Sequence, residues 1–145
     1  MPHSVAEIHC WRALRARNEA RLIRARQSVA AAARASAAAL ASLDAARAAF
    51  EQAAHEASKR RHEIERGMRA RYDFLQRADL YRATDAYASL ERMRDAARAK
   101  LADARTAHDD ACRTLEDARA RLTPLLRRRE KYRLALSRLR IGASS

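Results

Sequence analysis

The sequence predicts an all-α fold, a single antiparallel two-helix coiled-coil hairpin, and three observations carry this prediction. Its 145 residues include only two glycines and two prolines, and 34% are charged, which is typical of long helices. Apolar side chains recur at alternating steps of three and four residues in both halves, as in the seam of a left-handed coiled coil. A short segment joins the halves, so the second helix most simply folds back along the first.

The first predicted helix covers residues 5–67. One series of seam residues is spaced by seven, with a polar break at Arg15: Ile8, Leu22, Val29, Ser36, Leu43, Phe50, Ala57 and Ile64. Three residues further along each repeat is an alanine series: Ala25, Ala32, Ala39, Ala46 and Ala53. Alanine also makes up more than half of residues 28–50 and has the highest helix propensity, which favours a stiff helix.

The connection is predicted to turn near residues 73–74, within a tip formed by residues 68–84. Gly67 is expected to end the first helix or to weaken it there. Four of the chain's seven aromatic residues lie in or near the tip: Tyr72, Phe74, Tyr81 and Tyr87. Two interpretations stay open, a small cluster that closes the hairpin and an exposed surface that docks a partner.

The second predicted helix covers residues 80–140, and residues 141–145 are expected to be flexible. One seam series is Leu101, His108, Leu115, Leu122, Arg129 and Leu136. The other is Leu90, Ala97, Ala104, Ala111, Ala118, Leu125, Tyr132 and Leu139. Pro124 is expected to kink this helix, the alternative being a break and a restart with Thr123 as N-cap. His108 is interpreted as a polar residue that sets the register, and Arg94 and Arg129 are expected to extend out of the seam.

The two seams fit each other when residue n lies opposite residue 147 − n. Leu43 then faces Ala104, Ala46 faces Leu101, and nearly every layer pairs a large side chain with a small one. Such interdigitation fills space without voids. Residues 1–145 therefore form one hairpin domain, with both termini at the end away from the turn.

The net charge of +13 is concentrated at the two ends of the chain. Residues 1–28 carry +4, residues 119–145 carry +8, and the residues between them carry only +1. An antiparallel hairpin brings the two basic ends together as a basic base. A field of this kind favours an acidic or anionic partner.

The sequence lacks the signatures of several functional classes. It contains no glycine-rich phosphate loop, no nucleophile elbow and no His-Glu-x-x-His pair, so we expect no enzyme, no catalytic residue and no cofactor. His55 and His62 lie one heptad apart and are interpreted as solvent-facing rather than metal-binding. No segment approaches 18 uncharged apolar residues, so we expect no membrane span. Cys10 and Cys112 form no disulfide or metal pattern, which favours a cytoplasmic protein with reduced thiols.

A family resemblance rests on length and on three stretches of sequence. These are the heptad halves "LIRARQSVAAAARASAAALASLDAARAAF" and "LADARTAHDDACRTLEDARARL" and the basic end "LLRRREKYRLALSRLR". In these features the chain resembles the stalk proteins of type III secretion systems and flagellar export. Those proteins are similar to the coiled-coil shaft of the ATP synthase gamma subunit. The resemblance covers almost the whole chain and implies no catalytic residues.

The resemblance implies a non-enzymatic central stalk that links a hexameric export ATPase to an inner-membrane export gate and supports protein secretion. Its place would be the cytoplasm, peripheral to the inner membrane. The partners would be the secretion ATPase, the export-gate membrane protein and secretion chaperones, with no small-molecule substrate. By charge, the ATPase contact is assigned to Arg12, Arg15, Arg17, Arg21, Arg24, Arg127, Arg128, Arg129, Lys131 and Arg133. By apolar character, the export-gate contact is assigned to Tyr72, Phe74, Leu75, Leu80 and Tyr81.

Two alternatives belong to other functional classes. A basic helical protein could grip nucleic-acid phosphates with its arginines, with binding that falls steeply with salt. The charge balance of the middle of the chain and the lack of a DNA-binding motif disfavour this alternative. The other alternative is a generic coiled-coil scaffold in which two hairpins pair into a four-helix bundle.

Overall fold

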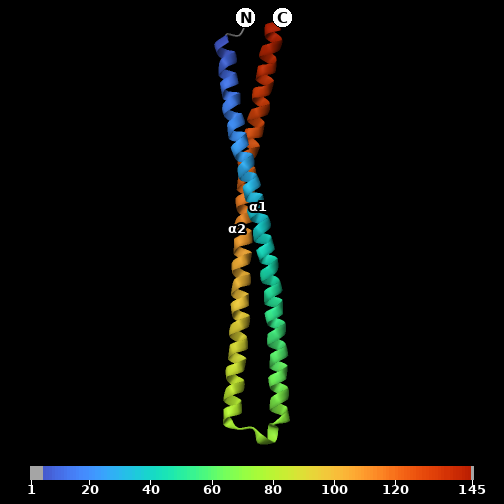
Figure 1. The fold of residues 1–145 in the computed structure, drawn as a ribbon. Coiled ribbons are helices and arrows are strands. Elements are labelled where there is room, and N and C mark those ends of the chain that lie inside the picture. Colours follow the sequence, from blue (N-terminus) through green and yellow to red (C-terminus); the bar gives the residue numbers. More distant parts are fainter. Residues whose placement is uncertain (1–4, 145) are drawn as a thin grey trace. The chain divides into compact units, whose positions relative to one another are not determined.

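Two long helices make up nearly all of the computed structural model, which describes the backbone of residues 5–144 (Figure 1). Helix α1 covers Val5–Ala70, the short 3₁₀ helix η1 covers Tyr72–Phe74, and helix α2 covers Arg77–Ser144. The two long helices contact each other, which confirms the predicted all-α helical hairpin.

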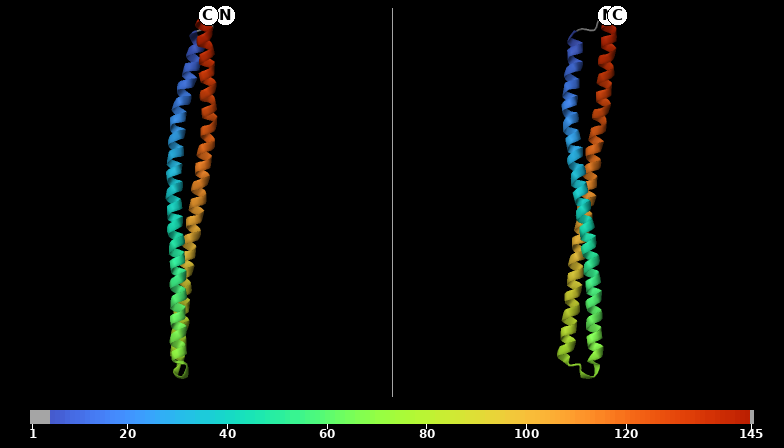
Figure 2. Two further views of the ribbon diagram at one scale, coloured as in Figure 1. Left: turned by 90° about the vertical axis from the view of Figure 1, so that its right-hand side faces the viewer. Right: turned by 45° about the vertical axis from the view of Figure 1, so that its right-hand side comes forward.

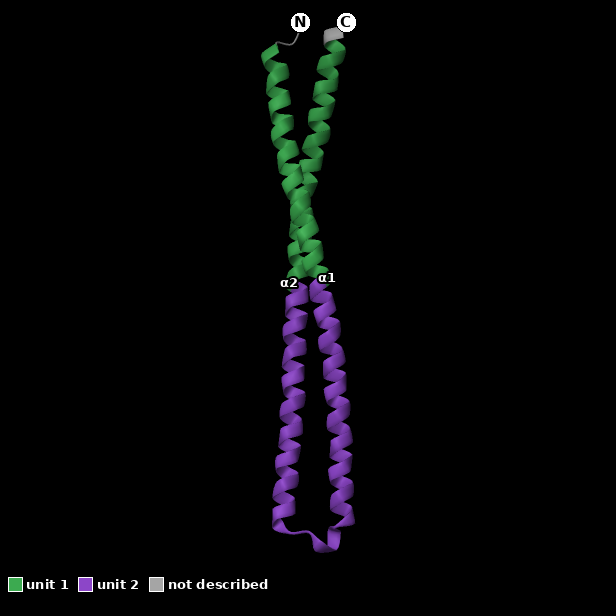
Figure 3. Cartoon of the chain, viewed as in Figure 1, with its two compact units in different colours: residues 1–37, 110–145 green, residues 38–109 purple. Residues whose placement is uncertain are grey.

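The chain divides into two compact units, and each contains a segment of both helices (Figure 3). Unit 1 comprises Met1–Ala37 and Asp110–Ser145, and unit 2 comprises Ala38–Asp109. Within each unit the α1 and α2 segments run side by side in opposite directions (Figure 2). The start of α1 and the end of α2 lie at the same end of unit 1, and unit 2 contains the turn.

The seam of unit 1 contains the predicted residues. Leu22 is fully buried, and Ala32, Ala118, Leu136 and Leu139 are buried as well. The rest of the predicted series in this unit is half-buried, except for the expected polar break at Arg15, which is exposed. Alternation of large and small apolar residues therefore builds the narrow core of unit 1.

Unit 2 continues the same pattern with different residues. Leu43, Leu90 and Leu101 are buried, and Ala46 and Ala97 are half-buried beside them. Half-buried Phe50 has the guanidinium of Arg98 over its ring, 6.0 Å from the centroid. The arginine thus covers a face of the aromatic ring in the seam while remaining exposed to water.

Contacts between the helices agree with the predicted register to within one helical turn. Ser36 Oγ and Cys112 Sγ lie 3.6 Å apart, where the prediction placed residue 111 opposite Ser36. In unit 2 the predicted partner of Phe50 was residue 97, and the observed contact is with Arg98. Nearer the termini, Asn18 Nδ2 donates to the Leu125 carbonyl at 3.1 Å, one turn from its predicted partner, residue 129.

Gly67 does not end the first helix. Helix α1 continues to Ala70, and no glycine in the described chain adopts a positive φ angle. Glycine ends helices efficiently when it adopts the left-handed conformation, and Gly67 instead keeps the helical one. The helix ends three residues later, where the Arg71 amide donates to the Met68 carbonyl at 3.2 Å and begins the tighter turn.

Helix α2 is longer than predicted at both ends. It begins at Arg77 rather than 80, because the Gln76 amide donates to Asp79 Oδ2 at 3.1 Å and caps the first turn. It also continues to Ser144, past the predicted end at residue 140, because one glycine there is too weak a signal to stop a helix. Ser145 lies outside the described residues.

Pro124 lies inside a continuous helix, so the alternative of a break with Thr123 as N-cap is wrong. The Thr123 hydroxyl donates to the Arg119 carbonyl at 3.3 Å, one turn back, and does not cap a new helix. Proline removes only one backbone hydrogen bond, and the seam residues on either side keep the helix in place.

One stretch of α1 is long and apolar enough, by length and composition, to qualify as a membrane span. The stretch includes charged residues, whereas the prediction concerned uncharged stretches, so the expected lack of a membrane span stays a prediction. Alanine provides the apolar character, since the region between Ser28 and Phe50 is rich in it. Only 11% of the stretch is buried, and a single such helix is weak evidence for a membrane span.

Replacing Leu22 by alanine should lower the free energy of unfolding by about 2–3 kcal/mol, because the fully buried side chain leaves a cavity in the seam of unit 1. Urea denaturation followed by circular dichroism measures the loss. Leu40→Ala is the control, since Leu40 is 44% exposed and its loss should change stability by less than about 0.5 kcal/mol. Equal losses in the two variants would contradict the proposed seam.

Gly67→Ala should stabilise the protein by about 0.5–1 kcal/mol, because glycine in a helix interior costs conformational entropy. A Cβ atom added at Gly67 meets nothing within 4 Å, so the substitution brings no clash. Gly142→Ala is a matched control that also meets nothing within 4 Å but lies near the end of α2. Its effect should be smaller, and the two are compared by thermal unfolding. A destabilised Gly67→Ala variant would show that the position needs glycine.

Candidate functional site

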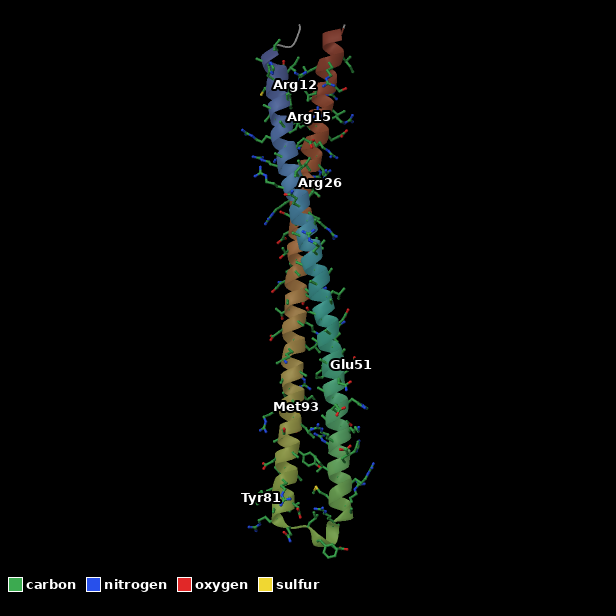
Figure 4. All side chains as sticks on the ribbon, viewed as in Figure 1. Arg12, Arg15, Arg26, Glu51, Tyr81 and Met93 are labelled. Atoms are coloured by element: carbon green, nitrogen blue, oxygen red, sulfur yellow. The ribbon has the colours of Figure 1, made fainter. Side chains whose placement is uncertain are left out.

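The residues assigned to the basic base come from both helices of unit 1. Nine of the ten are exposed, and Arg129 is half-buried in the seam. Arg12, Arg15 and Arg26 project from the part of α1 near the N-terminus (Figure 4). The structure therefore brings the α1 and α2 members of this set into one unit, as the hairpin prediction required.

One ion pair orders part of this surface. Arg133 donates through Nη2 to Glu130 Oε1 at 2.6 Å and through Nε to Oε2 at 3.1 Å. These hydrogen bonds lower the pKa of the Glu130 carboxyl below its ordinary value of 4.5, and the charges of Arg133 and Arg129 act in the same direction. The same bonds raise the pKa of Arg133. Glu130 is the only carboxylate among residues 119–145, and it is engaged by a neighbour on its own helix.

A groove beside the ion pair contains residues that the sequence analysis did not assign to the site. It has a volume of about 600 Å³, and its walls include Trp11 from α1 and Leu134, Ala135 and Arg138 from α2. The Trp11 ring lies 5.8 Å from the ring of Tyr132 at a tilt of 58°. Trp11 lies three residues after Ile8, in phase with the alanine series extended back by two heptads, but only the pairing of the helices places it beside the basic part of α2.

Asn18 is a second residue that the sequence analysis did not single out. It is 4% exposed and is the one buried polar residue of the described chain. Its Nδ2 donates to the Leu125 carbonyl, whereas Oδ1 has no hydrogen-bond partner. A buried amide of this kind favours one register over others at some cost in stability. Asn18 lies three residues after Arg15, in phase with the heptad series, and this spacing could have indicated that it lies in the seam.

The tip exposes most of its aromatic residues and does not form a closed cluster. Tyr72, Phe74 and Tyr81 are 77%, 81% and 63% exposed, and Leu80 is 49% exposed. Figure 4 shows Tyr81 at the start of α2, close to the turn. Of the five residues assigned to the export-gate contact, only Leu75 is half-buried. Tyr87 behaves differently, since it is half-buried and Arg61 lies over its ring at 5.8 Å.

The backbone of the turn holds these aromatic residues outward. The Phe74 amide donates to the Arg71 carbonyl at 2.8 Å, which closes the 3₁₀ turn. Leu75 then adopts an extended conformation, with φ −64° and ψ 123°, and is half-buried. Leu75 and Met68 line two adjoining hollows of about 370 and 280 Å³ in unit 2. The tip thus combines exposed aromatic rings with apolar hollows beside them.

The described residues include no group of three or more His, Cys, Asp or Glu side chains that could hold one metal ion. His55 and His62 are exposed, and His62 Nδ1 lies 3.8 Å from Glu65 Oε2. Cys10 is exposed and Cys112 is half-buried, and neither forms a disulfide. His108 is half-buried in the seam, as predicted. Arg94 is also half-buried, and its buried Nε atom has no hydrogen-bond partner.

Comparison of the chain with protein-family models, with curated proteins and with solved structures yielded no match.

The Glu130–Arg133 pair predicts a pH dependence. Because the folded-state pKa of Glu130 is lowered, the stability from this pair is present above pH 4.5 and is lost as the pH falls through the folded-state pKa. Arg133→Gln should raise the pKa of Glu130 toward 4.5, as followed by carboxyl-carbon NMR titration. Arg128→Gln, which makes no hydrogen bond to Glu130, is the control and should move it less. An unchanged pKa in Arg133→Gln would mean that the pair is absent in solution.

Proposed function

We propose that this protein is the non-enzymatic central stalk of a type III secretion or flagellar export system. In this proposal the paired termini insert into the hexameric export ATPase, and the turn contacts the export-gate protein of the inner membrane. The protein would work in the cytoplasm, at the membrane-bound secretion apparatus. Secretion chaperones are further proposed partners.

The pairing of the two basic segments in unit 1 is the observation that supports this proposal most. Residues 1–28 and 119–145 together hold nearly all of the net positive charge, and both belong to unit 1. Their arginines are largely exposed, so a partner can reach them. A concentrated positive field steers an acidic surface toward this end and fixes its orientation.

The exposed aromatic residues of the turn support the second contact. Tyr72 and Phe74 are each more than three-quarters exposed. Aromatic side chains are favoured anchors of protein interfaces, because they bury a large apolar area with little loss of conformational freedom. Solvent exposure of these rings costs free energy in the isolated protein, and a partner surface would remove that cost.

Reversing the charges of Arg127, Arg128 and Arg129 to glutamate should weaken capture of the hexameric export ATPase by at least about tenfold in a pull-down. A control variant reverses Arg66, Arg92 and Arg105, three exposed arginines of unit 2 with the same total change in charge. It should bind nearly as well as the unmodified protein. A second pair, Tyr72→Ser with Phe74→Ser, should lose the gate protein but keep the ATPase.

Two outcomes would overturn the proposal. Equal weakening in the unit 1 and unit 2 charge variants would mean that only total charge matters. Tight binding to duplex DNA that falls steeply with salt, without capture of the ATPase, would favour the nucleic-acid alternative.

A further inference from the structure

The groove beside Trp11 has walls of two chemical kinds. We call it the Trp11 groove; its main lining residues are Trp11, Arg127, Lys131, Leu134, Ala135 and Arg138. Trp11 belongs to α1 and the other five to α2, and all lie in unit 1. The groove exists only because the hairpin brings the two helices together.

The charged wall carries unpaired cations. Arg127, Lys131 and Arg138 are exposed, and none of them forms an ion pair within the described chain. Glu130 also lines the groove, but Arg133, which lies outside the lining, already engages both of its oxygens. The groove therefore offers three cations, and its one carboxylate is neutralised by a residue that does not line it.

The apolar wall is open to solvent, and its tryptophan is held by a contact with a neighbouring ring. Leu134 is 43% exposed, and Ala135 lies beside it on α2. The tilted contact with Tyr132 limits the positions that the Trp11 indole can take. A tryptophan held in place before binding loses little freedom when a partner covers it, which raises the affinity of such a site.

The spacing along α2 matches another helix. Arg127, Lys131, Leu134 and Arg138 follow one another at steps of four, three and four, which places them on one face of α2 over about 16 Å. A partner helix with carboxylates and a leucine at the same steps would meet the cations with charge and Leu134 with an apolar side chain. A phosphate backbone could pair with the cations but would leave the apolar wall wet.

We propose that the Trp11 groove binds an acidic amphipathic helix of a partner protein. The inference rests on the proposed function for placing a protein partner at this end of the hairpin. It adds to that function the chemistry of the contact and names Trp11, Leu134 and Arg138 as contact residues.

Trp11 is the only tryptophan of the chain and reports on the groove directly. The full-length protein is titrated with a synthetic peptide of about 20 residues, long enough to be helical, with glutamates and leucines on adjoining stripes. Saturable movement of the Trp11 emission to shorter wavelength is expected. A peptide of the same composition in scrambled order should bind at least about tenfold more weakly.

Matched variants distinguish peptide binding in the groove from attraction by the overall positive charge. Arg127→Glu and Leu134→Gln should each weaken peptide binding at least about tenfold. Arg121→Glu reverses the same charge on another exposed arginine of unit 1 that lies outside the groove lining, and Leu40→Gln alters a leucine of 44% exposure in unit 2. Both controls should stay within about twofold of the unmodified protein. Circular dichroism verifies that each variant is folded.

Several results would overturn the inference. These are no change in Trp11 emission, equal binding of the scrambled peptide, or equal weakening by Arg121→Glu and Arg127→Glu. Tighter groove-dependent binding of duplex DNA or anionic lipid vesicles would also overturn it. The proposed function would survive if Leu134→Gln still captured the ATPase while the triple charge reversal did not. Failure of capture by the unmodified protein would instead overturn the proposed function.

Discussion

Packing of leucine against alanine along the seam is the interaction on which the hairpin depends. Each unit buries only a narrow stripe of side chains, such as Leu22 and Ala32 in unit 1 and Leu43 and Leu101 in unit 2. Alanine lets the backbones approach closely, and leucine from the facing helix fills the space beside it. Because no other core exists within the described residues, helix propensity and this stripe together must offset the entropy of ordering two long helices.

Because the seam consists mainly of alanine and leucine, the exposed aromatic residues of the candidate contact surfaces are not needed for its packing. A seam of alanine and leucine needs few aromatic residues, yet Tyr72, Phe74 and Tyr81 are exposed around the turn, and Trp11 lies beside cations in unit 1. Two polar residues in the seam, Asn18 and Arg94, have buried atoms without partners. Their cost in stability is consistent with a role in selecting the register, because a stripe of repeated alanines offers several registers of similar packing.

Much of the fold could be predicted from the sequence, but less of the candidate site. The heptad series predicted the inward-facing residues in both helices, and the charge distribution predicted which segments form the basic surface. The differences lie at the helix ends: α1 continues three residues past Gly67, and α2 begins at residue 77 instead of the predicted 80. Helix ends depend on local hydrogen bonds, such as that from the Gln76 amide to Asp79, whose formation the pattern of apolar residues does not reveal.

The sequence by itself determined the helical type, the seam and the location of the charge, because periodicity, composition and charge are properties of the linear sequence. Tertiary structure alone decided which side chains meet across the hairpin. Trp11 and Lys131 are far apart in sequence, and only the pairing of α1 with α2 places them in one groove. The exposure of Tyr72 and Phe74 was likewise undecided until the 3₁₀ turn held them outward. Contacts between distant segments depend on register and backbone direction, which one-dimensional patterns leave open.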